Sequence, residues 1–181
     1  MQITPTAIPD LLLIEPAIHR DERGFFLESF RASALAEAGV KHAFVQDNHA
    51  QSVKNTLRGL HYQTTPGQAK LLRCTRGAIW DVAVDVRPDS STFGQWVGVE
   101  LDAERYQMLY IPVGFAHGYA ALSDVVEVQY KCSNYYDGKT EAGIAYDDPD
   151  IAIPWPVDTP IVSERDRNNP RLRDVFPKAG S

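Results

Sequence analysis

Short runs of strand-forming residues alternate with turn-forming residues along most of the chain. Such a pattern is typical of an antiparallel β-sandwich or barrel. The expected strands are residues 11–15, 25–30, 44–47, 57–63, 70–73, 79–86, 96–101, 108–111, 117–122 and 125–131. The pattern therefore predicts an all-β fold, a sandwich or barrel of antiparallel strands with few helices.

The clearest alternation of apolar and polar side chains runs through residues 79–86. Because side chains along a strand point alternately to its two faces, Trp80 and three valines lie on one face. Asp81 and Asp85 lie on the other face. We expect one face of this strand to be core and the other to be partly polar.

Only one segment carries a clear helical pattern. Residues 32–38 are rich in alanine and leucine and stop at Gly39, which suits a left-handed helix cap. From Asp147 onward the chain is dense in proline and charge, which predicts an irregular tail over the barrel. Such a tail can still deliver a functional side chain to a pocket.

The length and composition narrow the possible classes of protein. A chain of 181 residues fits one domain, expected to span residues 1–181. The net charge of −6 argues against a nucleic-acid partner, and no apolar run is long enough for a membrane span. The N-terminus lacks a signal-like segment, so a cytoplasmic location is expected. Cys74 and Cys132 are far apart and are expected to be reduced and buried.

Two histidines have neighbours that favour a chemical role. The spacing Pro112-x-Gly114-x-x-His117 has the form of the second half of the cupin motif, a turn that aims a histidine into the barrel. Metal-binding cupins supply further ligands from a first half, but here Gln63 stands where the second histidine after His61 would be. We therefore expect no metal, which leaves His61 and His117 free for acid–base work.

Several motifs resemble the dTDP-4-dehydrorhamnose 3,5-epimerase family, in the family's order and over nearly the whole chain. They are residues 21–28 (DERGFFLE), 46–48 (QDN), 58–63 (RGLHYQ), 70–74 (KLLRC), 77–87 (GAIWDVAVDVR), 112–119 (PVGFAHGY), 130–131 (YK), 135–136 (YY) and 163–166 (SERD). The resemblance implies a cupin jelly roll that forms a homodimer and uses no cofactor. It also implies inversion of C3 and C5 beside the ketone of dTDP-4-dehydro-6-deoxy-D-glucose, giving dTDP-4-dehydro-L-rhamnose for dTDP-L-rhamnose biosynthesis.

The resemblance also implies catalytic roles. His61 matches the base and Asp166 its partner, which fixes the imidazole tautomer. Tyr130 matches the acid that returns a proton from the opposite face, and Lys70 matches the group that stabilises the enolate oxygen. For His117 we expect ketone polarisation or support of the network.

The remaining site residues are expected around the nucleotide and sugar. The resemblance assigns substrate binding to a set that begins on the N-terminal segment, and it gives Asp81 a supporting role behind His117. The set is Arg23, Phe26, Glu28, Gln46, Asp47, Asn48, Arg58, His117, Tyr136, Glu141 and Arg165. Arginine can grip a phosphate with two parallel hydrogen bonds, while Phe26 and Tyr136 either stack on the ligand or belong to the core.

Two features depart from the resemblance. Many relatives have a lysine before the tail aspartate where this chain has Arg165, which puts a nucleotide contact there in doubt. Strict alternation also places Arg58 and His61 on opposite faces of one strand. A bulge at Gly59 would bring both side chains into the pocket.

Other functions stay open on the sequence alone. An epimerase of one carbon, or of a different dTDP sugar, would carry the same residues. A non-catalytic sugar-nucleotide-binding jelly roll would need the pocket but not the His, Asp and Tyr set. A metal-dependent cupin would show a stoichiometric metal by elemental analysis. A homodimer is also consistent with Glu127, Gln129 and Lys131, which leave a polar sheet face for a partner.

Overall fold

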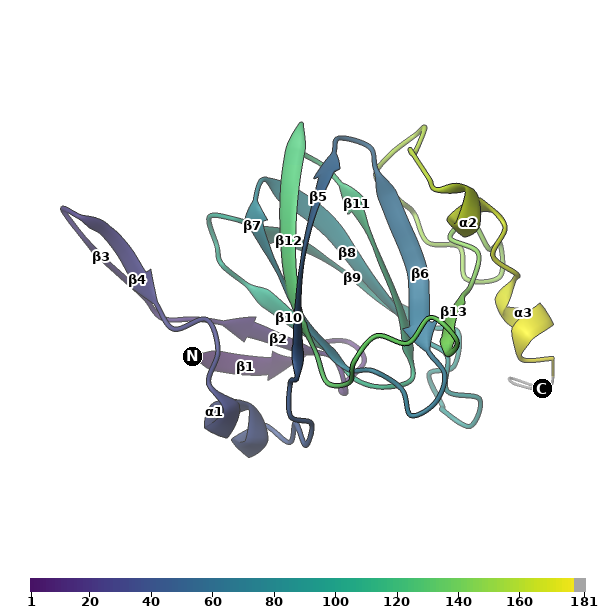
Figure 1. The fold of residues 1–181 in the computed structure, drawn as a ribbon, viewed down its shortest axis with the longest axis horizontal. Coiled ribbons are helices and arrows are strands. Elements are labelled where there is room, and N and C mark those ends of the chain that lie inside the picture. The colour runs from purple at the N-terminus through teal and green to yellow at the C-terminus, as the bar shows by residue number, and fades with distance from the viewer. Residues whose placement is uncertain (178–181) are drawn as a thin grey trace.

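Two antiparallel β-sheets form the body of the protein in a computed structural model that describes residues 1–177 (Figure 1). The six-stranded sheet has the order β1 (Gln2–Pro5), β2 (Leu12–Glu15), β10 (Met108–Ile111), β7 (Lys70–Arg76), β12 (Val125–Cys132) and β5 (Gln46–Val53). The five-stranded sheet has the order β13 (Glu141–Gly143), β6 (Leu57–Gln63), β11 (Phe115–Ala121), β8 (Ala78–Asp85) and β9 (Trp96–Asp102). The expected all-β antiparallel class is confirmed.

A separate hairpin and three short helices complete the fold. The hairpin is formed by β3 (Ile18–Asp21) and β4 (Gly24–Leu27) and projects away from the sheets at the left of Figure 1. The helices are α1 (Ala32–Glu37), α2 (Glu164–Arg167) and α3 (Leu172–Val175), and α2 lies beside β6 on the opposite side of the molecule. None of the helices within residues 1–177 is long and apolar enough to cross a membrane.

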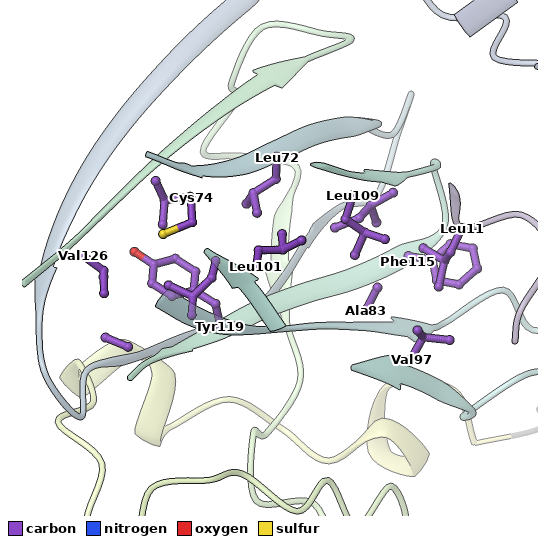
Figure 2. Close-up of a cluster of buried hydrophobic side chains, with 14 of the residues drawn as sticks. Leu11, Leu72, Cys74, Ala83, Val97, Leu101, Leu109, Phe115, Tyr119 and Val126 are labelled. Atoms are coloured by element: carbon purple, nitrogen blue, oxygen red, sulfur yellow. The ribbon is translucent and has the colours of Figure 1, made fainter. Parts of the chain in front are cut away.

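The main core fills the space between the two sheets. Leu72, Leu109 and Val126 from the six-stranded sheet meet Ala83 and Tyr119 from the other sheet (Figure 2). Cys74 is buried there as a free thiol, and Cys132 is also buried and free. Burial of this apolar surface is the main driving force that closes the sheets on each other.

The two faces of β8 differ as expected, one apolar and the other partly polar, and both faces are buried. Ile79 and Ala83 share the interior face with Asp81 and Asp85, and both carboxylates are fully buried. On the other face, Val82 and Val84 pack against residues that follow β13, such as Ile144, Ile151 and Leu172. The C-terminal tail therefore forms a second apolar layer over the five-stranded sheet.

Most expected strands occur, with shifted ends. The bounds of β6 and β10 are as expected, whereas β5 begins at Gln46 and extends to Val53, well beyond residue 47. The strand after Gly24 ends at Leu27. The strands β1, β3 and β13 are not predicted from the pattern, because each is too short to show an alternation. The helix at residues 32–38 is confirmed as α1, and Gly39 follows it with a φ of +90°.

Candidate active site

Ionisable side chains from both sheets and from the tail line one cavity of about 490 Å³. Residues of β5, β6 and α2 are part of its wall. His61 and His117 come from β6 and β11 of the five-stranded sheet. Lys70 and Tyr130 come from β7 and β12 of the six-stranded sheet, which faces them. Arg58, Arg165 and Asp166 also line the cavity. The four side chains expected to be catalytic are thus brought together.

His61 and Asp166 form a close pair inside this cavity. Asp166 is only 4% exposed, and its Oδ1 lies 2.5 Å from His61 Nε2. With an ionised carboxylate at that distance, the imidazole proton resides on Nε2, and Nδ1 keeps the lone pair that a base needs. Burial alone would raise the pKa of Asp166, but hydrogen bonds from His61 and from the Gly59 backbone N–H lower it on balance.

The tail reaches this position through backbone bonds to β6. Ile161 pairs with Thr56, and the Leu57 N–H donates to the Ile161 carbonyl. Ser163 then caps α2, because its hydroxyl accepts the N–H of Asp166 at 3.1 Å. This short helix turns Asp166 inward toward His61, so the tail places a carboxylate in the cavity.

Burial sets the protonation of the two side chains from the opposite sheet. It lowers the pKa of Lys70, although Cys132, Glu141 and Asp81 partly oppose the shift. It raises the pKa of Tyr130, and Cys132 adds to that shift. Tyr130 therefore keeps its phenolic proton at neutral pH and can act as a proton donor. The Lys70 side chain offers N–H donors to an oxyanion in the same cavity.

His117 is the direct cross-strand partner of His61, so both rings lie on the same side of the sheet. Its Nε2 lies 2.7 Å from Oδ1 of the fully buried Asp81. Burial lowers the pKa of His117 despite the carboxylate, which favours a neutral imidazole. Asp81 Oδ2 has no hydrogen-bond partner among the described residues. Asp81 thus lies behind His117, as expected from the sequence.

The bulge that Arg58 requires is present in β6. His117 pairs with His61 and Tyr119 pairs with Arg58, so three residue steps on β6 oppose two on β11. Gly59 has a φ of +130°, and an added Cβ there would lie 2.5 Å from the Gly118 Cα. Only glycine fits this close approach of two backbones. The extra residue turns Arg58 and His61 toward the same cavity.

A second polar cluster lies beside the cavity at Arg165. The Arg165 guanidinium contacts Glu141 Oε2, and the Tyr136 hydroxyl donates to the same oxygen at 2.8 Å. Gln46 accepts the Tyr136 N–H at 2.9 Å and donates to Asn48 at 3.0 Å. Tyr136 is 56% exposed, which shows that it is not a core aromatic. Arg165 is thus paired with a carboxylate.

Four of the expected binding residues lie away from the cavity. Asp47 is on the outer face of the six-stranded sheet, where its carboxylate binds Lys131 at 2.9 Å. Arg23, Phe26 and Glu28 are on or beside the projecting hairpin, far from β6 and α2 (Figure 1). Phe26 is 70% exposed, which excludes the core alternative for this side chain. A single chain therefore does not bring these residues to its own cavity.

The described residues 1–177 contain no group of three or more histidine, cysteine, aspartate or glutamate side chains placed to hold a metal ion. Gln63, at the position of the second cupin histidine, accepts a hydrogen bond from the Thr140 hydroxyl at 2.5 Å. His61 and His117 each use Nε2 to contact a carboxylate.

Sequence reasoning missed one hydroxyl that belongs to the cavity wall and a second hydroxyl that contacts it. Tyr119 lines the cavity, and its hydroxyl lies 3.0 Å from the buried Ser52 hydroxyl. The alternation of strands could have found them. Tyr119 is two residues after His117, so their side chains point to the same face of β11. Ser52 is an even number of residues from Gln46 and Asn48, so these side chains share one face of β5.

Two antiparallel sheets that close around a polar cavity define a cupin-type enzyme fold, here with side chains for acid–base chemistry. The chain belongs to the dTDP-4-dehydrorhamnose 3,5-epimerase family, since the model of that family matches residues 5–174. The enzyme of that name from Shigella flexneri is 51% identical over 97% of this chain and 98% of its own length.

Solved structures agree with this assignment. The dTDP-6-deoxy-D-glucose-3,5-epimerase of Legionella pneumophila, solved with dTDP-4-keto-L-rhamnose, has a TM-score of 0.93 and 44% identity over 99% of both chains. A 3'-monoepimerase of Streptomyces bikiniensis, solved with dTDP-quinovose, has a TM-score of 0.90 and 38% identity over 97% of this chain and 91% of its own.

Proposed function

We propose that the protein inverts C3 and C5 of dTDP-4-dehydro-6-deoxy-D-glucose to give dTDP-4-dehydro-L-rhamnose. The observation that carries the proposal is that the proposed base and the proposed acid come from opposite sheets. His61 belongs to one sheet and Tyr130 to the sheet opposite, and both line one cavity. A sugar ring held between the sheets would have the base over one face and the acid over the other, as inversion requires.

The proposed chemistry is proton removal followed by proton return. The neutral His61 takes the proton from the carbon beside the ketone, and the electron pair of that bond moves to the ketone oxygen as an enolate. Lys70 stabilises the enolate oxygen, and Asp166 stabilises the imidazolium. Tyr130 then gives its proton to the carbon from the other face. His61 loses its proton to solvent and Tyr130 regains one before the next inversion.

The nucleotide half of the substrate lies, in this proposal, toward Arg58 and Arg165. Both guanidinium groups line the cavity and suit a diphosphate, because the planar fork of arginine matches phosphate oxygens. Tyr136 and Glu141 lie next to Arg165. The dTDP-4-dehydrorhamnose 3,5-epimerase of Bacillus anthracis, 44% identical to this chain, was solved with TDP and pyrophosphate bound.

The site is complete, we propose, only in a homodimer in which each protomer extends its hairpin β3–β4 to its partner. The hairpin carries Arg23 and Phe26 away from the cavity of its own chain (Figure 1). Its exposed aromatic side chains, Phe25 and Phe26, favour a covered position in an assembly. The polar outer face of β12 would lie in the same interface. A cytoplasmic location also remains our proposal, consistent with the free thiols of Cys74 and Cys132.

The test is incubation of the purified protein with dTDP-4-dehydro-6-deoxy-D-glucose in deuterated water, followed by proton NMR and mass spectrometry. Deuterium at both C3 and C5 with inversion at both is the expected result. Inversion at C3 alone would support a monoepimerase, the activity of the Streptomyces bikiniensis relative. Binding without any deuterium uptake would leave a non-catalytic sugar-nucleotide-binding protein, and the proposal would be wrong.

A further inference from the structure

Hydrogen bonds connect three polar side chains, Tyr119, Ser52 and Arg58, in a series from the barrel core to the cavity. The hydroxyls of Tyr119 and Ser52 lie 3.0 Å apart, and both residues are only 5% exposed. Arg58 donates its Nε–H to the Ser52 hydroxyl at 3.0 Å. A second bond runs from Arg58 Nη2 to the backbone carbonyl of Gln51 at 3.1 Å. This series of hydrogen bonds links a core aromatic side chain to an exposed guanidinium.

The Tyr119 ring fixes the core end of this series of hydrogen bonds. The ring belongs to the main core cluster, and in Figure 2 it lies among Cys74, Leu101 and Val126 with its oxygen at the edge of the cluster. Close-packed core side chains occupy single rotamers, so the hydroxyl has a fixed place. Burial also raises the pKa of Tyr119, and its phenol stays neutral beside Arg58.

The two bonds that Arg58 makes leave its outer edge unoccupied by these partners. A guanidinium has five N–H donors, and the bonds to Ser52 and Gln51 use one on Nε and one on Nη2. Both donors of Nη1 and one of Nη2 remain for a ligand. Two parallel donors in one plane are the geometry that a phosphate group accepts.

We infer that Ser52 and Tyr119 are positioning residues that hold the Arg58 guanidinium for the diphosphate of the substrate. The inference rests on the proposed function and adds how the anion contact is oriented. Without the Ser52 hydroxyl the arginine side chain regains rotamer freedom, and that freedom must be lost again when the diphosphate binds. The cost therefore falls on affinity for the diphosphate rather than on the proton transfers.

The experiment measures binding of dTDP by calorimetry to wild type, Ser52→Ala, Tyr119→Phe and Arg58→Ala. Ser52→Ala should weaken dTDP binding at least about fivefold, and Tyr119→Phe should weaken it in the same direction by less. Thymidine, followed by NMR shifts, lacks the diphosphate, and its affinity should change less than about twofold. In turnover, KM should rise more than kcat falls.

Matched variants separate this effect from general damage. Ser123→Ala removes a hydroxyl that accepts the Ala78 N–H outside the cavity, and Tyr110→Phe alters a buried tyrosine outside the cavity. Both should bind dTDP as wild type does. In an Arg58→Ala background, Ser52→Ala should have no further effect on dTDP affinity, because the two changes act through one group.

The outcomes of this experiment separate the positioning role from the proposed function. If wild type binds dTDP and Ser52→Ala and Tyr119→Phe bind it equally well, the positioning role is wrong while the proposed function stands. If Ser52→Ala lowers kcat and not dTDP affinity, the Ser52 hydroxyl acts on the chemical step and the inference is also wrong. If wild type itself binds no dTDP, the proposed nucleotide site fails instead.

Discussion

Asp166 Oδ1 lies 2.5 Å from His61 Nε2, although 105 residues separate the two in the chain. One residue belongs to a strand of the barrel and the other to a short helix of the tail. Because the carboxylate holds the Nε2 proton, it defines which ring nitrogen is free to accept another. The first prediction concerns this pair.

Asp166→Asn should fold normally and lose catalysis by about 10²- to 10⁴-fold, since an amide stabilises the wrong tautomer and no imidazolium. The measurement is kcat for epimerisation, with circular dichroism as the check on folding. Glu164→Gln on the same helix is the control and should keep the wild-type rate, because Glu164 is exposed. A wild-type rate in Asp166→Asn would show that the pair has no catalytic role.

Tyr130→Phe should separate proton removal from proton return. His61, Asp166 and Lys70 remain in this variant, so the carbon–hydrogen bond should still break. The His61 imidazolium would exchange its proton with solvent deuterium and return a deuteron to the enolate from the side that the proton left. In deuterated water the substrate should gain deuterium and keep its configuration, as read by mass spectrometry and proton NMR.

Two other results would contradict this division of roles. Inversion at the wild-type rate would make Tyr130 a packing residue, with Tyr136 the next candidate for the acid. Loss of both exchange and inversion would show that Tyr130 is needed for binding or for proton removal. Tyr110→Phe, a buried tyrosine outside the cavity, is the matched control.

Mixed dimers should test whether the hairpin completes the partner's site. His61→Ala alone should lower turnover at least about 10²-fold, the low end of what a positioned base contributes. Arg23→Ala combined with Phe26→Ala should also be poorly active. A dimer of one chain of each kind would place both defects in one site and none in the other, so about half of the wild-type activity should return.

The measurement uses co-expressed chains with two different purification tags and compares the mixed dimer with each parent dimer. His42→Asn replaces His61→Ala in the control, because His42 is exposed and does not line the cavity. No regain of activity, or a monomeric mass by light scattering, would exclude the shared site.

Acid should destabilise the fold through Asp85, a buried carboxylate. Burial would raise its pKa, but donors from Arg87, Ser90 and Thr92 outweigh it and lower the pKa from 3.8 to about 2. The folded form therefore binds the proton less readily than the unfolded chain. The stabilisation is complete above pH 3.8 and is lost as the pH falls toward about 2, with a size of about 2 kcal/mol.

Removing two of the donors should reduce this acid-dependent part. Ser90 and Thr92 each donate a hydroxyl to Asp85 Oδ2 at 2.6 Å. Ser90→Ala with Thr92→Val should lower the free energy of unfolding at pH 7 by about 1–2 kcal/mol and by less at pH 2. Urea unfolding at both pH values measures it. Thr6→Val, which lacks a carboxylate partner, should change stability equally at both.

The sequence by itself determined the fold class and singled out four side chains, His61, Lys70, Tyr130 and Asp166, that line one cavity in the structure. Alternating short strands predict a β-sandwich because each strand must bury one face. The motif around His61 and the spacing before His117 identified the histidines, and the absence of further ligands near them is visible in the chain itself. The ends of β5 and the short strands β1, β3 and β13 escaped prediction, since pairing with neighbours and not local pattern defines them.

Only the tertiary structure decided which side chains meet. The bulge at Gly59 that turns Arg58 inward depends on the approach of Gly118 from the next strand. The opposition of His61 and Tyr130 depends on the closure of two sheets, and the contact of Asp166 with His61 depends on how the tail returns to β6. The positions of Arg23 and Phe26 show the same limit, because a sequence motif does not reveal that the hairpin carries these residues away from the cavity of their own chain (Figure 1). These are contacts between segments distant in the chain, and local residue preferences carry no information on their geometry.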